Sequence, residues 1–109
     1  MAWYLFQGSL TSEAWADLVK NPQDRREALK PLMDAVGGSI EHYFFALGEN
    51  DIYILYQAPD DKTVASAMMA VLSGGAIKSG KTVSLMTMED ALDAMRTAGD
   101  LTYRPPAGN

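Results

Sequence analysis

One stretch of the sequence has the residue types and spacing of a phosphate-binding loop. Residues 75–82 read GAIKSGKT, which fits the pattern G-x-x-x-x-G-K-[ST]. In nucleotide-binding proteins this loop leaves a strand and enters a helix, so that backbone N–H groups at the helix N-terminus face the phosphates. Here the expected order is reversed, because the stretch follows a helix and runs into a strand. We therefore expect Gly74 and Gly75 to end a helix, Gly80 to lie in a turn, and no nucleotide to bind.

The single histidine, His42, is the second candidate for chemistry. Histidine exchanges protons near neutral pH, so one interpretation is a proton relay through His42 that Tyr53 assists. The other is a structural histidine, hydrogen-bonded to Gln57 or to the backbone within an interface. One histidine among scattered carboxylates is a weak ligand set, and the chain has no cysteine. We expect no metal and no other cofactor.

The composition is that of an ordinary globular domain. The chain has 109 residues, the length of one domain, with 48% hydrophobic and 21% charged residues. The net charge of −5 disfavours binding to a phosphate backbone, and Arg25, Arg26, Lys78 and Lys81 are interpreted as solvated surface charge. No apolar run approaches the roughly 18 residues of a membrane span, and the N-terminus lacks a secretory pattern. We expect a cytoplasmic protein that binds neither nucleic acid nor membrane.

The hydrophobic periodicity predicts a ferredoxin-like α+β fold. Helical spacing predicts helices over residues 12–20, 24–36, 61–73 and 88–98, and apolar stretches predict strands over residues 2–10, 39–47, 51–57 and 81–87. Pro31 lies inside the second helix and should bend or divide it. The order βαββαβ with an extra C-terminal helix indicates a four-stranded antiparallel sheet with helices on one face. We expect this domain to span residues 1–99 and an extended tail to span residues 100–109.

Both faces of the predicted sheet are apolar. With a turn at residues 48–51, Phe45 would lie opposite Ile54. Alternation then places Glu41, Tyr43, Phe45, Leu47, Ile52, Ile54 and Tyr56 on one face, and Ile40, His42, Phe44, Ala46, Tyr53, Leu55 and Gln57 on the other. The helices cover only one face, and a bare second face would be too apolar for a monomer. We expect a homo-oligomer, most simply a two-fold dimer with its sheets packed face to face.

The face that carries His42 mixes polar side chains with apolar ones, as ligand pockets do. We interpret His42 and Tyr53 as candidate catalytic residues. The candidate ligand-binding residues are Trp3, Gln7, Phe44, Leu55 and Gln57. The sequence does not decide whether the protein is an enzyme.

Several segments, in order, resemble the GYD domain family of uncharacterised bacterial proteins. They include VGGSIEHYFFALGENDIYIL, APDDKTVASAMM and SGGAIKSGKTVSLMTMEDALDAMRTAG, and the likeness covers almost the whole chain. The resemblance implies a dimeric α+β barrel architecture and brings no established reaction. The family is named for a Gly-x-Tyr-Asp element, and in this chain Asn50 stands where the tyrosine usually is.

These observations lead to one expected function and one alternative. We expect a homo-oligomeric protein that binds a small, largely apolar molecule between sheet and helices or between subunits. By analogy with related barrels, its catalytic form is cofactor-independent acid–base chemistry of the isomerase, lyase or oxygenase type. The alternative is a non-catalytic assembly or regulatory module whose second sheet face only self-associates.

Overall fold

The computed structural model describes residues 1–107. Its elements are β1 (Ala2–Leu10), α1 (Ser12–Lys20), α2 (Arg25–Ala35), β2 (Ser39–Phe45), β3 (Ile52–Ala58), α3 (Asp61–Leu72), β4 (Ile77–Leu85) and α4 (Met88–Gly99). Every predicted helix and strand is present, although β4 begins earlier than expected. Of the predicted tail, residues 100–107 form no helix or strand, and residues 108 and 109 lie outside the described residues.

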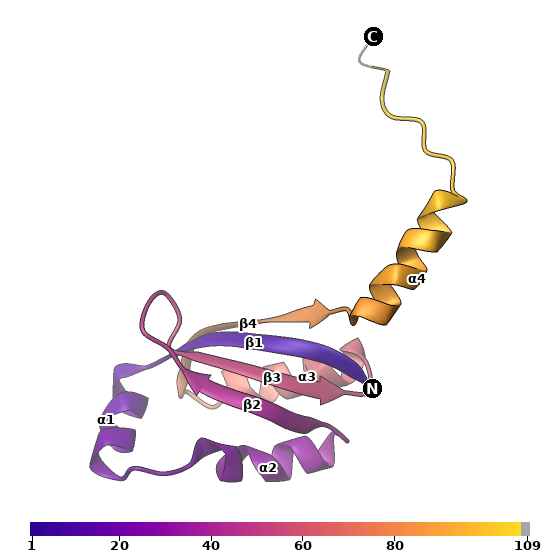
Figure 1. The fold of residues 1–109 in the computed structure, drawn as a ribbon. Coiled ribbons are helices and arrows are strands. Elements are labelled where there is room, and N and C mark those ends of the chain that lie inside the picture. Colours follow the sequence, from indigo (N-terminus) through magenta and orange to yellow (C-terminus); the bar gives the residue numbers. More distant parts are fainter. Residues whose placement is uncertain (108–109) are drawn as a thin grey trace.

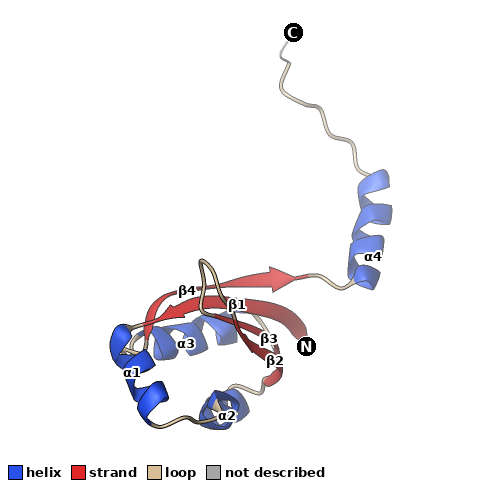
Figure 2. Cartoon of the chain, turned by 60° about the vertical axis from the view of Figure 1, so that its left-hand side comes forward, coloured by secondary structure: helices blue, strands red, loops and turns tan. Residues whose placement is uncertain are grey.

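The four strands form one antiparallel sheet in the order β2-β3-β1-β4. Helices α2 and α3 lie beneath one face of this sheet, and α1 lies at its end (Figures 1 and 2). This confirms the predicted α+β fold with a four-stranded antiparallel sheet. The face away from these helices is called the open face below.

The hydrophobic core lies between the sheet and the helices. Its buried residues are Tyr4, Phe6, Leu10, Ile52, Ile54, Tyr56, Ala58 and Val64. Along β3 every second residue is buried and the residues between are half-buried, as expected for a strand covered on one face. The Tyr4 hydroxyl donates to Asp61 Oδ1 over 2.7 Å, which fastens the first turn of α3 to β1.

The helices begin at residues that the sequence indicates. Side chains of Thr11, Asp24, Asp60 and Thr87 accept backbone N–H groups of α1, α2, α3 and α4. Pro31 does not divide the second helix, because α2 runs through this residue; of the two predicted effects, the division is wrong and the bend stays a prediction. Leu29 and Met33, on either side of Pro31, both pack against the core and hold the two halves together.

The hairpin register differs from the prediction by two residues. Phe45 lies opposite Ile52, and Tyr43 lies opposite Ile54. An even shift keeps each of these residues on its predicted face. A bulge between Ile40 and His42 changes the faces on which two residues lie. Ile40 packs towards the core, and Glu41 contacts Gln57 on the open face. Their predicted faces were therefore wrong, since alternation alone does not reveal a bulge.

The phosphate-loop pattern lies mostly within β4, and Gly80 is in mid-strand rather than in the predicted turn. Gly80 pairs with Gly8 of β1, and the Phe6 ring lies over both. A Cβ atom at residue 80 would be 2.8 Å from Phe6 Cζ, and one at residue 8 would be 2.6 Å from Phe6 Cε2. The two glycines therefore provide the space in which this ring lies flat on the sheet.

Helix α4 extends away from the sheet and carries the chain beyond it (Figure 1). Together with the following residues it contributes to a long molecule, with extents of 60 × 34 × 22 Å. Met88, Leu92 and Met95 recur at helical spacing on α4, and Met88 is 71% exposed. None of the core residues or the residues packed against them belongs to α4.

Candidate functional site

The open face carries all the residues that the sequence analysis proposed as a site. Strand β1 contributes Trp3 and Gln7, β3 contributes Tyr53, Leu55 and Gln57, and β2 contributes His42 and Phe44. Gln7 and Phe44 flank Tyr53 on the two neighbouring strands, and Leu55 lies opposite His42. Strand β4 adds Lys81, Val83 and Leu85, whose positions on this face the sequence analysis did not assign.

The polar groups of the open face are only partly connected. Gln57 Nε2 donates to Glu41 Oε1 over 2.9 Å, and Ser39 Oγ donates to the same oxygen over 3.1 Å. The His42 ring stacks on Phe44, with centroids 5.8 Å apart. Within residues 1–107, no hydrogen bond joins His42 to Tyr53 or to Gln57. The structure therefore places the proposed relay residues on one face without a hydrogen bond between them.

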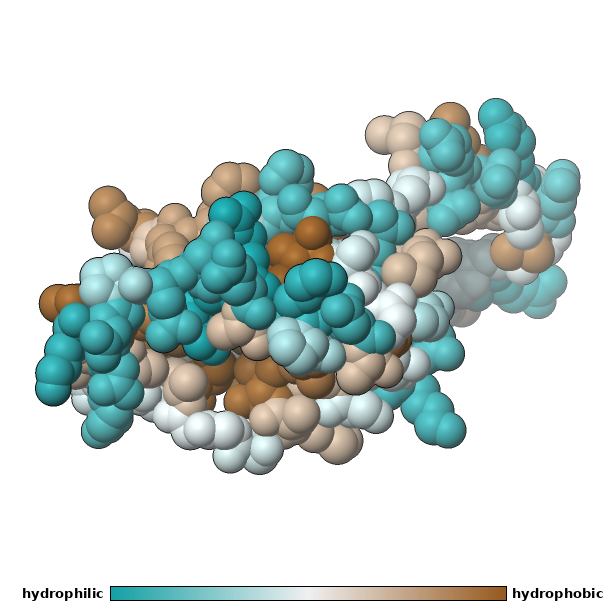
Figure 3. Space-filling view, turned by 90° about the horizontal axis from the view of Figure 1, so that it is seen from below, coloured by the Kyte–Doolittle hydropathy of each residue, from teal (hydrophilic) through white to brown (hydrophobic). Residues whose placement is uncertain are grey.

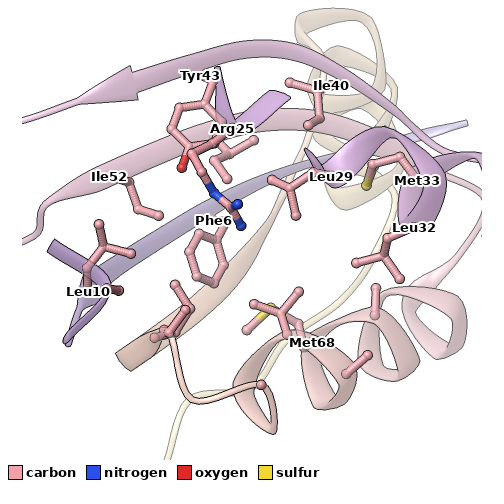
Figure 4. Close-up of a pocket in the computed structure, with 18 of the residues that line it drawn as sticks. Phe6, Leu10, Arg25, Leu29, Leu32, Met33, Ile40, Tyr43, Ile52 and Met68 are labelled. Carbon is pink, nitrogen blue, oxygen red and sulfur yellow. The ribbon is translucent and has the colours of Figure 1, made fainter. Parts of the chain in front are cut away.

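A cavity lies on the opposite side of the sheet, between the core strands and helices α1, α2 and α3. Its volume is about 430 Å³, which is within the range of small-molecule pockets. Most of its lining is apolar and includes Phe6, Leu29, Leu32, Met33, Ile54 and Met68 (Figure 4). Seen from the side of the helices, apolar residues are visible between the polar residues of the surface (Figure 3).

Arg25 and Tyr43 lie at the polar end of this cavity. Figure 4 shows the Arg25 side chain reaching inwards between Tyr43 and Leu29. Burial raises the pKa of the Tyr43 hydroxyl, and the nearby Arg25 guanidinium offsets part of this rise. The Tyr43 hydroxyl is therefore protonated at neutral pH and can donate a hydrogen bond. Asp17 is the carboxylate among the lining residues.

The interpretation of Arg25 as solvated surface charge is wrong, because this side chain is half-buried and lines the cavity. Arg25, Leu29 and Met33 are spaced four residues apart and therefore share one stripe of α2. Leu29 and Met33 are apolar and pack against the core. The same periodicity could have indicated that Arg25 faces inwards, whereas Arg26 faces solvent and pairs with Asp24.

Within residues 1–107 no three His, Asp or Glu side chains cluster as metal ligands would. None of the helices in this part of the chain combines the length and apolar character needed to cross a bilayer.

Comparison with known proteins assigns the family. The GYD domain family matches residues 4–95. The chain belongs to this family. A relative from Thermus thermophilus, the glutamine synthetase and cystathionine beta-lyase binding protein, is 30% identical over 79 residues, which cover 72% of this chain and 83% of the relative. The crystal structure of MtbAldR is similar in fold, with a TM-score of 0.57 and 16% identity, over 79% of this chain and 53% of that chain.

The residues that correspond to the GYD element lie in the hairpin between β2 and β3. Asp51 Oδ2 accepts hydrogen bonds from the Leu10 backbone N–H over 2.9 Å and from Trp15 Nε1 over 3.2 Å. This carboxylate therefore ties the hairpin to the end of β1 and to α1. Asn50, at the position of the usual tyrosine, donates through Nδ2 to the Tyr53 hydroxyl over 3.3 Å. In this GYD protein the aspartate has a structural role, and Asn50 orients a residue of the open face.

Proposed function

We propose that this GYD protein is a homo-oligomer that binds a small, largely apolar molecule in the cavity between sheet and helices. The cavity is the observation that carries the proposal. This cavity of about 430 Å³ is partly open to solvent, so its apolar lining lacks packing contacts with protein and faces water, which costs stability. A bound apolar molecule would restore those contacts and would itself be removed from water.

The open face supports self-association as the second part of the proposal. Phe44 is 58% exposed there, and Leu55 of β3, Leu5 of β1 and Val83 of β4 lie side by side. A contiguous apolar surface of this kind is a typical contact between subunits. Packing two open faces together would leave the cavity, on the other side of each sheet, accessible to a ligand.

Native mass spectrometry of the full-length protein tests both parts. We expect an oligomer, and a variant with Phe44→Glu should be a monomer because it would bury a charge in the contact. Val19→Glu is the matched control, since Val19 is 77% exposed on α1, away from the open face. A wild-type protein that is monomeric at micromolar concentration would contradict the proposed assembly.

Binding in the cavity is tested with decanol, an apolar probe without charge. Decanol should raise the melting temperature of the wild-type protein by mass action. Leu32→Trp should abolish this increase by filling the cavity, whereas Val19→Trp, which adds the same side chain to an exposed position, should not. If decanol and other apolar probes leave all three proteins unchanged, the cavity does not bind small molecules.

A second candidate function is binding to a metabolic enzyme. It is favoured by the name of the Thermus thermophilus relative, which is a binding protein for glutamine synthetase and cystathionine beta-lyase. The exposed stripe of α4, with Met88 and Met95, is the surface that such a partner would contact. A pull-down of purified glutamine synthetase should fail with Met95→Glu and succeed with Thr97→Glu. Equal capture by both variants would exclude α4 as the contact.

Catalysis by His42 and Tyr53 is a separate proposal, in which a substrate binds between subunits rather than in the cavity, because both residues lie on the open face. In a face-to-face oligomer these residues would be enclosed between subunits, where proton transfer is shielded from water. His42→Gln should then abolish turnover of any identified substrate. Unchanged turnover would show that His42 is not the acid or base.

A further inference from the structure

We propose that the ligand of the cavity is an amphipathic monoanion, a molecule with an apolar body and one carboxylate that binds Arg25. This inference rests on the proposed function and specifies its ligand class. The apolar body would contact the walls around Phe6 and Leu29, and the carboxylate would remain at the polar end.

Arg25 is the basic residue among those that line the cavity. It is half-buried, and in the described part of the chain it forms no salt bridge. Its guanidinium makes one long hydrogen bond, from Nη1 to Gln23 Oε1 over 3.4 Å. A half-buried guanidinium has five N–H donors, and most of these have no protein acceptor here. The side chain is therefore available for a bidentate interaction with a carboxylate.

The neighbouring cations of α2 differ from Arg25, because each of them forms an ion pair. Arg26 contacts Asp24 over 2.7 Å, and Lys30 contacts Asp34 over 3.1 Å. Both ion pairs lie on the solvent side of the helix, and in each the carboxylate is close in sequence to the cation. Arg25 instead lies on the inward stripe with Leu29, where the helix provides no carboxylate.

Tyr43 offers a second donor at the same end of the cavity. The hydroxyl of Tyr4 donates to Asp61, and that of Tyr56 pairs with Thr82 over 3.1 Å. The Tyr43 hydroxyl forms no hydrogen bond to protein among residues 1–107, although it is close to Arg25 (Figure 4). This O–H group is protonated at neutral pH, as in any tyrosine, and burial raises its pKa further. A carboxylate beside Arg25 would provide an acceptor for this O–H group.

The charge of the lining limits the ligand to one negative charge. Asp17 lies in the same lining as Arg25, so a ligand with a second negative charge would meet both attraction and repulsion. The walls beyond this end carry no further cation that could neutralise a phosphate dianion. A carboxylate on an aliphatic or aromatic body fits this arrangement better than a nucleotide or a sugar phosphate.

The test compares decanoate with decanol, which have the same chain length and differ in charge. Isothermal titration calorimetry on the full-length protein should give at least tenfold tighter binding of decanoate. Arg25→Gln should weaken decanoate by roughly 10- to 100-fold, the usual effect of losing a charged hydrogen-bonded contact. The affinity of the Arg25→Gln variant for decanol should be unchanged, and this unchanged affinity would also show that the variant is folded. Arg26→Gln, on the solvent side of the same helix, should affect neither ligand.

Each other outcome has a distinct meaning. Equal affinity for decanoate and decanol in the wild-type protein would overturn the monoanion inference and leave the proposed function standing. Tighter decanoate binding that survives Arg25→Gln would overturn the role of Arg25. If neither molecule binds, the proposed small-molecule function fails, and the inference fails with it.

Discussion

Replacing Gly80 by alanine tests whether the Phe6 ring needs the glycine pair beneath it. The new Cβ would lie 2.8 Å from Phe6 Cζ and 2.9 Å from Phe6 Cε1. Carbon atoms normally approach to about 3.5–4.0 Å, so the ring would have to withdraw by roughly 1 Å. Phe6 is only 5% exposed, so it can move only by disturbing its neighbours or by entering the cavity that it lines.

The expected net effect of Gly80→Ala is a loss of about 1–2 kcal/mol in the free energy of unfolding. Overpacking a core costs about 1–3 kcal/mol, and the lower entropy of an alanine in the unfolded chain offsets about 0.4–1 kcal/mol. For a domain of this size the melting temperature should fall by roughly 5–10 °C. If the ring moves into the cavity, the affinity for decanol should fall as well.

Thermal unfolding followed by circular dichroism measures this effect, and Gly99→Ala is the control. A Cβ at residue 99 would have no heavy atom within 4 Å, so this change should not destabilise the sheet domain. Introducing Gly80→Ala into a Phe6→Leu background should cost much less, because the clashing ring atoms are gone. An unchanged melting temperature of Gly80→Ala, or an equal loss of stability in both backgrounds, would show that the Phe6 ring does not need this glycine.

Three further predictions concern single hydrogen-bonded or exposed groups. The hydrogen bond to Asp61 is the main reason that the pKa of Tyr4 is raised from 10.0 to about 12, and burial is the second. The folded state therefore holds this proton more tightly than the unfolded state does. The stability that this proton contributes should be fully present below pH 10 and lost as the pH rises towards 12. Tyr4→Phe should lack this loss in alkaline urea titrations, and an unchanged alkaline limb would contradict the assignment. Asp51→Ala should cost about 2 kcal/mol and alter Trp15 fluorescence, because two N–H donors lose a charged acceptor; a variant as stable as wild type would exclude the bridging role. His42→Gln should leave decanoate affinity unchanged, since His42 lies on the open face, and weaker binding would place the ligand there instead.

Much of the fold follows from local signals in the sequence. Thr11 and Asp60 begin helices where N-cap residues predict, and alternation along β3 separates buried from half-buried residues. The register of the hairpin was wrong by two residues, because turn composition does not define which residues pair first. The bulge between Ile40 and His42 was missed because alternation assumes a regular strand and no residue type in this stretch marks an extra residue.

The candidate site was less accessible to sequence reasoning. The chemistry-bearing side chains His42 and Tyr53 drew attention to the open face, because polar residues in an apolar strand are visible in the sequence. A cavity is instead an absence of side-chain atoms between elements that are distant in the chain, and no local pattern records it. Arg25 could have been assigned to it only from its spacing with Leu29.

The separate position of α4 has a consequence for how the molecule unfolds. An isolated helix of 12 residues is marginal in water, since most helix stability comes from packing an apolar face. Its Met88 and Met95 side chains face solvent, so in an isolated chain α4 should unfold independently of the sheet and its core. Amide hydrogens of α4 should then exchange orders of magnitude faster than those of β1. If another molecule covers α4, dilution of the protein should increase the exchange rate of the α4 amides. If nothing covers it, this rate should not depend on protein concentration.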